Sequence, residues 1–105
     1  MDIINVDVSN IDSELANGIV LLDVWSSDCA PCVAFGKLLP AIAEAVGSVK
    51  ILKLSVSEDA NRKWAVAKGV RGIPAVFIYK NGSVVKSWTG LKNKDFVIEE
   101  LKSLL

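Results

Sequence analysis

The chain has 105 residues, of which 51% are apolar and 23% charged, and these values predict one small globular domain spanning residues 1–105. The same composition excludes disordered and fibrous proteins. Twelve basic residues balance twelve acidic ones, so no net charge favours binding to nucleic acid or to an acidic membrane surface.

The first part of the chain predicts a strand, a short helix and a second strand. Ile4–Val8 alternates apolar and polar residues, as a strand with one buried face does. Ser9 and Asp12 have the spacing of a capping box, and Gly18 would end the helix that follows it. The nearly continuous apolar run Ile19–Trp25 is typical of a strand that is buried on both faces of a sheet.

A longer helix and a third strand come next. The spacing of the apolar residues after Cys29 predicts a helix that reaches Val46, with Pro40 as a kink and Gly47 as the residue that ends it. Val49–Val56 is rich in β-branched residues and predicts another strand.

The last part of the chain predicts a helix, a hairpin and a final helix. Residues 57–68 form the first of these helices, with Gly69 at its end. Strands at 75–79 and 83–89 flank Asn81-Gly82, a strong hairpin turn signal. Asn93 would cap the final helix. Its apolar positions are Val97, Ile98, Leu101, Leu104 and Leu105.

The resulting order β-α-β-α-β-α-β-β-α predicts a mixed α/β sheet with helices on both faces. Two strand-helix-strand units imply parallel pairing with right-handed crossovers, and the hairpin adds an antiparallel pair. The segment that begins at Cys29 follows the carboxyl end of a central strand, where open α/β sheets usually carry their sites.

Cys29 and Cys32 are the only cysteines, and the sequence has no histidine, which excludes Ser-His-Asp and Cys-His sites. The pair fits three interpretations. A helix N-terminus favours a thiolate on Cys29 and hence a redox pair. Half a zinc site would need a partner subunit to complete its four ligands. Two buried small apolar residues would be purely structural. Pro31, in the first turn of the helix, favours the redox interpretation.

Asp23–Cys32 (DVWSSDCAPC), followed by Pro40, Gly72-Ile73-Pro74, Asn81-Gly82 and Gly90, resembles the thioredoxin family over essentially the whole chain. The resemblance implies a thioredoxin fold, in which a mixed sheet of five strands in the order 1-3-2-4-5 is flanked by four helices. It also implies a cis peptide bond before Pro74, close to the cysteines in space.

The chemistry assigns different roles to the two cysteines. Exposed Cys29 would attack a substrate disulfide as a thiolate, and Cys32 would then resolve the mixed disulfide. The second attack needs a proton acceptor, and without histidine Asp23 is the best candidate. The resemblance implies the same role for Asp23 and places Lys53 as its partner. Asp23 could instead be a structural carboxylate, but the apolar run around it predicts burial and a raised pKa.

Further residues are expected to shape the site. The backbone of Ile73, just before Pro74, would pair with an extended substrate segment. Gly72 and Gly90 would keep the groove flat or serve only as turn residues. Trp25 would pack beneath the active-site loop. The expected supporting residues are Pro74, Ile73, Lys53, Trp25, Ala30, Pro31, Asp28 and Gly90.

The motif departs from the family pattern Trp-Cys-Gly-Pro-Cys-Lys at three positions. Asp28 replaces an aromatic residue of the docking surface, Ala30 a glycine and Val33 a basic residue. A carboxylate close to the thiolate opposes its formation, so we expect a raised pKa for the Cys29 thiol and a more reducing dithiol. Asp28 could instead be a solvated or capping residue that points away from the sulfur.

The predicted function is thiol-disulfide exchange, as a protein-disulfide reductase that carries electrons through a reversible Cys29–Cys32 disulfide without a bound cofactor or metal. The alternatives are an oxidant or isomerase of the same fold, and a non-catalytic thioredoxin-like binding module or subunit of a larger complex. An oxidant or isomerase is disfavoured because such relatives carry a histidine between the cysteines and an export signal.

The expected partners are disulfide-containing proteins and a thioredoxin reductase, either of the NADPH/flavin type or a dedicated ferredoxin- or flavin-linked one. We expect a monomer that binds neither nucleic acid nor membrane. Met1-Asp2 leads directly into Ile3-Ile4 without a targeting pattern, and the longest apolar runs are far shorter than the roughly 20 residues of a spanning helix. These features predict a cytoplasmic protein.

Overall fold

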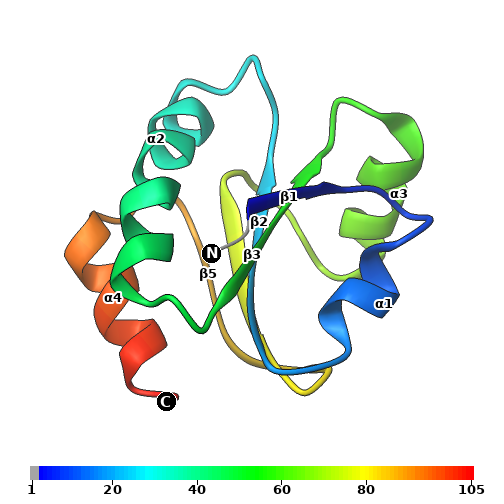
Figure 1. Cartoon of the computed structure of the whole chain (residues 1–105). Helices are drawn as coiled ribbons and strands as arrows, with labels where there is room; N and C mark the ends of the chain where they lie inside the picture. Colours follow the sequence, from blue (N-terminus) through cyan, green and yellow to red (C-terminus); the bar gives the residue numbers. More distant parts are fainter. Residues whose placement is uncertain (1–2) are drawn as a thin grey trace.

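The computed structural model describes residues 3–105, in which strands and helices follow one another in the predicted order (Figure 1). The elements are β1 (Ile3–Val6), α1 (Ile11–Leu15), β2 (Ile19–Trp25), α2 (Ala30–Ala45), β3 (Lys50–Ser55), α3 (Asp59–Ala67), β4 (Ala75–Lys80), β5 (Ser83–Thr89) and α4 (Lys94–Lys102). No helix within residues 3–105 combines the length and the apolar character needed to cross a membrane.

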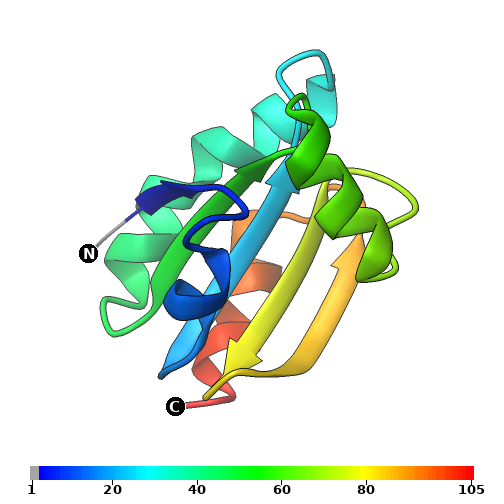
Figure 2. The same ribbon diagram turned by 90° about the vertical axis from the view of Figure 1, so that its right-hand side faces the viewer.

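The strands form one mixed sheet in the order β1-β3-β2-β4-β5, which confirms the order that the resemblance implied. β1 and β2 each pair parallel with β3, whereas β4 pairs antiparallel with both β2 and β5. The carboxyl ends of β2 and β3 therefore lie at the same edge of the sheet, where the chain enters α2 and α3 (Figure 2). This edge carries the cysteine segment.

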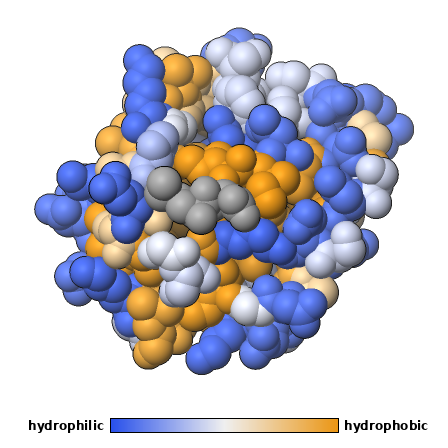
Figure 3. All heavy atoms as spheres, viewed as in Figure 1, coloured by the Kyte–Doolittle hydropathy of each residue, from blue (hydrophilic) through white to orange (hydrophobic). Residues whose placement is uncertain are grey.

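Two helical layers cover the sheet, with α2 and α4 on one face and α1 and α3 on the other (Figures 1 and 2). Along β2, Leu21 packs in the core beneath α2 and α4, while Val20 and Leu22 pack in the core on the opposite face. All three side chains are fully buried, which confirms the prediction of a strand covered on both sides. Hydrophobic side chains gather between the two layers and hydrophilic ones form most of the outline of the molecule (Figure 3).

The segment between β1 and α1 differs from its prediction. β1 ends at Val6 rather than Val8, because the Asp7 carboxylate accepts hydrogen bonds from both the backbone N–H and the hydroxyl of Ser9. Asn10 instead occupies the N-cap, where its side chain makes no capping hydrogen bond, so the predicted capping box is wrong. Hydrogen bonds from side chains to the nearby backbone favour a turn at residues 7–10, so the helix begins later than predicted.

Gly69 ends α3 as predicted, because it directly follows the C-cap Lys68 and its φ of +89° is the left-handed backbone of a glycine at a helix end. Gly18 also has a positive φ, +74°, but it lies two residues beyond the C-cap of α1, Ala16, and its N–H donates to the Asn81 side chain at 2.9 Å, so it belongs to the turn before β2. Asn93 caps α4, with its side-chain oxygen accepting a hydrogen bond from the Phe96 N–H at 2.8 Å. Gly47 is not in the left-handed region, although α2 ends two residues before it.

Pro40 lies inside α2, as predicted, and does not end the helix. The predicted end of the final helix differs from the structure. α4 ends at Lys102, so Leu104 and Leu105 follow the helix instead of belonging to it, and only Leu104 packs against the core.

Candidate functional site

The cysteine pair lies where β2 passes into α2. Cys29 is the N-cap residue of α2, and its sulfur accepts a hydrogen bond from the Cys32 backbone N–H at 3.2 Å. Pro31 occupies the first turn, where its missing N–H leaves no helical hydrogen bond unmade. The positive end of the helix dipole therefore faces Cys29, which favours a thiolate there in the reduced state.

Cys29 and Cys32 form a disulfide with their Cα atoms 5.2 Å apart. Cys29 is partly exposed, whereas Cys32 is 1% exposed. The difference in exposure agrees with the predicted roles of an attacking and a resolving cysteine.

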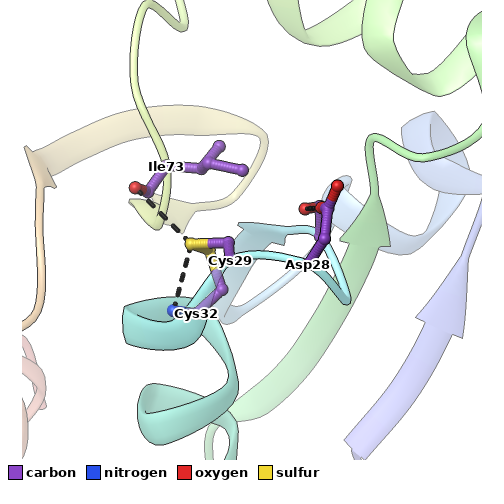
Figure 4. The surroundings of a disulfide bond; sticks show 5 residues. Asp28, Cys29, Cys32 and Ile73 are labelled. Carbon is purple, nitrogen blue, oxygen red and sulfur yellow. Dashed lines mark hydrogen bonds between the residues drawn. A yellow bond between two sulfur atoms is a disulfide. The ribbon is translucent and has the colours of Figure 1, made fainter.

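The segment Ile73-Pro74 lies against this disulfide although it is distant in the sequence (Figure 4). The Ile73 carbonyl oxygen is 3.9 Å from the Cys29 sulfur, and the Ile73–Pro74 peptide bond is cis. Both the predicted proximity and the predicted cis bond are confirmed.

Two glycines hold the backbone around Pro74. The Gly90 N–H donates a hydrogen bond to the Pro74 carbonyl at 2.8 Å, and its φ of +100° is a conformation that favours glycine. A Cβ atom on Gly72 would lie only 3.2 Å from the Thr89 methyl carbon. Close packing against Thr89 therefore favours glycine at position 72, and the backbone conformation favours it at position 90.

Asp23 is the one carboxylate among the fully buried residues of the described chain. It alternates with Leu21 along β2 and so lies on the face beneath α2, opposite Lys53 on β3 and Val76 on β4. Its side chain is 0% exposed, and neither of its oxygens has a hydrogen-bond partner among the protein groups. Burial raises the pKa of Asp23 to about 7, although the Lys53 ammonium acts in the opposite direction. The predicted burial is confirmed.

Lys53 contacts Trp25 closely. Its ammonium lies 4.2 Å from the centroid of the Trp25 ring, a cation–π contact, and a Cβ atom on Gly36 would be 3.4 Å from the same nitrogen. The Lys53 ammonium is held between Trp25 and α2, and its charge lowers the pKa of Asp23 without a direct ion pair. Sequence reasoning did not identify Gly36, although a glycine inside a helix is a recognised sign of a packing requirement.

Asp28 is oriented by a neighbour that the sequence analysis did not single out. The hydroxyl of buried Ser26 donates a hydrogen bond to the Asp28 carboxylate, which lowers the pKa of Asp28. The Asp28 side chain is exposed and points away from the disulfide in Figure 4. Asp28 thus stays charged, but solvent screens its effect on Cys29.

We therefore expect Asp28→Asn to lower the pKa of the Cys29 thiol by less than about one unit, since a solvated carboxylate acts weakly on a charge several ångströms away. The rate of iodoacetamide alkylation as a function of pH would measure this in the reduced protein. Asp7→Asn is the matched control, because exposed Asp7 is likewise bound by a serine hydroxyl but lies in the β1–α1 turn. A shift of equal size in both variants would contradict a local effect of Asp28.

No group of three or more Cys, Asp or Glu side chains that could hold a metal ion occurs within residues 3–105. The two sulfurs of the Cys29–Cys32 disulfide and the buried carboxylate of Asp23 are the chemical groups of this site. The two sulfurs can carry out thiol-disulfide exchange, and a buried carboxylate with a raised pKa can accept a proton.

Sequence comparison with known proteins covers nearly the whole chain. Residues 2–103 match the family model described as Thioredoxin. The chain belongs to the thioredoxin family. Its sheet order, its four helices within residues 3–105 and its cis proline constitute a thioredoxin fold.

Thioredoxins of three bacteria illustrate the similarity. The protein from Chlamydia muridarum is 35% identical over 94 residues, covering 90% of each chain. The Bacillus subtilis protein is 32% identical over 100 residues and 94% of each chain. The Streptomyces clavuligerus protein is 40% identical over 75 residues, which are 71% of this chain and 68% of the relative. The family match and the Cys29–Cys32 pair together identify the chain as a thiol-disulfide oxidoreductase that acts as a protein-disulfide reductase.

Proposed function

We propose that the chain reduces protein disulfides in two exchange steps at Cys29 and Cys32. The Cys29 thiolate attacks one sulfur of the substrate disulfide, and the other substrate sulfur leaves as a thiolate. The Cys32 thiolate then attacks the Cys29 sulfur of the mixed disulfide and releases the second substrate thiolate. The substrate gains two electrons from the chain and two protons, one equivalent to the proton lost by Cys32 and one from solvent, while the chain closes its own disulfide.

The observation that carries this assignment is the unequal setting of the two sulfurs. Cys29 is partly exposed at the N-terminus of α2, where a substrate can reach it and where the helix dipole favours its thiolate. Cys32 is 1% exposed, so it reacts only with a sulfur already bonded to Cys29.

Asp23 accepts the Cys32 proton in the second step. Its carboxylate oxygens make no hydrogen bond to a protein group, so both remain available to accept a proton. A pKa of about 7 means that Asp23 exchanges protons readily near neutral pH. Lys53 is its positioning partner and limits how far burial raises that pKa.

The backbone beside Pro74 receives an extended segment of the substrate. The Ile73 carbonyl is directed at the Cys29 sulfur and is available to a substrate N–H, as in strand addition. Trp25, Ala30 and Pro31 support the loop that presents Cys29.

A reductase of the NADPH/flavin type, or a dedicated ferredoxin- or flavin-linked one, returns two electrons to the Cys29–Cys32 disulfide. We place this cycle in the cytoplasm, a reducing compartment in which a dithiol can be maintained. Residues 1–105 act in it as one monomeric domain.

Insulin reduction by dithiothreitol tests the proposal. Addition of the wild-type protein is expected to accelerate precipitation of the insulin B chain, because exchange through a helix N-terminal thiolate is faster than attack by free dithiothreitol at neutral pH. A heat-unfolded sample provides the control. If the folded protein gives no acceleration, the reductase assignment fails and the binding module becomes the better explanation.

A further inference from the structure

A groove of about 400 Å³ opens between α2 and the loop that joins β5 to α4. We name it the Leu91 groove. Ala34, Leu38, Leu91, Lys92 and Asn93 line it. Leu91 is 46% exposed although it is apolar, and nearby Val33 on α2 is 40% exposed. The groove thus offers an apolar surface that is large enough for one aliphatic side chain.

The residues that line the Leu91 groove are neighbours in sequence of residues at the cysteine site. Leu91 directly follows Gly90, whose N–H donates to the Pro74 carbonyl, and Pro74 follows the Ile73 carbonyl at 3.9 Å from the Cys29 sulfur. On the other wall, Ala34 lies two residues beyond Cys32 on α2. A segment that pairs with Ile73 and extends toward Gly90 therefore reaches this groove.

The charge around the groove is positive. Lys92 lines it, Lys37 precedes Leu38 on α2, and Lys94 begins α4. Among residues 3–105, none of these lysines forms an ion pair with a carboxylate. Asp95, in the first turn of α4, is the acidic residue nearest in sequence.

The opposite side of the site carries the opposite charge. In Figure 4, Asp28 lies on one side of the disulfide, and the strand β5 that leads to Gly90 lies on the other. Because the Ser26 hydroxyl lowers the pKa of Asp28, this carboxylate stays ionised at neutral pH. The rim is thus negative beside Asp28 and positive beside Lys92.

We propose that the Leu91 groove is a specificity site for the substrate, and that it binds an aliphatic side chain flanked by acidic residues on the substrate segment that extends past Gly90. The proposal rests on the reductase function and adds a preference to it. The apolar lining of the groove takes the aliphatic side chain, while Lys92 attracts the acidic neighbours and Asp28 repels them from the other side. The opposite charges of Asp28 and Lys92 thus orient the substrate, with its acidic residues toward Lys92.

Synthetic peptides test the preference. Each carries one cysteine joined to thiopyridine through a disulfide, with a leucine between two glutamates or between two lysines. The leucine segment precedes the cysteine in one series and follows it in the other. The rate constant for thiopyridine release by the reduced protein measures docking and attack together. Dipyridyl disulfide, a small neutral probe, measures exchange chemistry without the groove.

The wild type is expected to prefer the glutamate peptide in one of the two series. Lys92→Glu should lower the ratio of the glutamate rate to the lysine rate by about fivefold, the size expected for reversing an exposed charge at an interface rim. Lys102→Glu is the matched control, because it makes the same change of net charge at the far end of α4 and should alter the ratio by less than about twofold. A further peptide has glycine in place of the leucine between the two glutamates, and Leu91→Ser should lower the ratio of the leucine rate to the glycine rate.

Three outcomes overturn the proposal, in different ways. If the wild type reduces dipyridyl disulfide but Lys92→Glu and Lys102→Glu give the same ratio, the groove has no role in specificity and the reductase function stands. If the wild type fails to reduce dipyridyl disulfide, the reductase function fails and the groove proposal fails with it. Wild-type dimers in sedimentation velocity that Leu91→Ser dissociates would assign the groove to a second copy of the chain.

Discussion

Cys29→Ser is expected to lower the catalysed rate of insulin reduction by at least about a thousandfold, since the variant lacks the attacking thiolate. Cys32→Ser is expected to complete the first exchange and then stop. Its mixed disulfide with the substrate cannot be resolved from within the chain, because a serine hydroxyl does not attack a disulfide. The two variants should thus fail at different steps, one before and one after covalent attachment.

Mass spectrometry separates these outcomes. After addition of an oxidised protein substrate, reduced Cys32→Ser should gain the mass of the substrate, and dithiothreitol should release it. Cys29→Ser should gain none, since its remaining sulfur is 1% exposed. Ser27→Ala, in the exposed turn before the cysteines, is a control that should retain the wild-type rate. A covalent adduct on Cys29→Ser would show that Cys32 is the attacking sulfur and reverse the assigned roles.

The parts of the fold that the sequence predicted well depend on strong local signals. The apolar run of β2 can be satisfied only in the middle of a covered sheet, and its bounds, Ile19–Trp25, agree with the structure. Asn81-Gly82 produces the hairpin between β4 and β5, with both residues at positive φ. Pro31 and the helix start set the cysteines at the carboxyl end of β2.

Other features depend on contacts between distant segments. The turn after β1 is determined partly by Asn61, which is 1% exposed on α3 and accepts a hydrogen bond from the Val8 N–H at 3.1 Å. Its amide group also donates to the Ser55 carbonyl at 3.0 Å. A polar residue in an amphipathic helix gives no sign that such partners will surround it, so neither its burial nor the early end of β1 could be predicted.

The electrostatics of the site were predicted only in part. The sequence indicates a buried Asp23, because the surrounding residues are apolar. It does not indicate that the Lys53 ammonium lies on the Trp25 ring, or that Ser26 turns Asp28 away from the sulfur. Side-chain directions of this kind are decided by packing between α2, β3 and the active-site turn, which one sequence does not specify.

The largest effect on stability is expected from Asp23. Its ordinary pKa is 3.8, and burial raises the pKa to about 7 in the folded chain. The folded state therefore holds the Asp23 proton more tightly than the unfolded state. This contribution favours folding most below about pH 4, is lost as pH rises toward 7 and stays lost above 7. The total loss is about 4 kcal/mol, from roughly three pKa units at about 1.4 kcal/mol each.

Asp23→Asn removes this titration, so its free energy of unfolding relative to the wild type should rise by about 4 kcal/mol between pH 4 and pH 8. Urea unfolding of the oxidised proteins across this range would measure the difference. Glu44→Gln, at an exposed position on α2, is the control for loss of a carboxylate. Lys53→Met removes the cation that lowers the pKa of Asp23. This variant should therefore lose its stability at a higher pH than the wild type does. A constant Asp23→Asn difference across the range would contradict the raised pKa.

The same variant decides whether Asp23 moves a proton. Without a proton acceptor, resolution of the mixed disulfide near pH 7 should slow by about 100-fold, and the limb of its pH–rate profile with a midpoint near 7 should disappear. First attack by Cys29 should change little, since that thiolate is stabilised by the start of α2 rather than by Asp23. A purely structural carboxylate predicts the stability gain without either kinetic change. If Asp23→Asn is more stable and resolves the mixed disulfide at the wild-type rate, Asp23 has no role in proton transfer. If the variant is more stable but resolves slowly, the slow step is caused by the missing proton acceptor and not by a damaged fold.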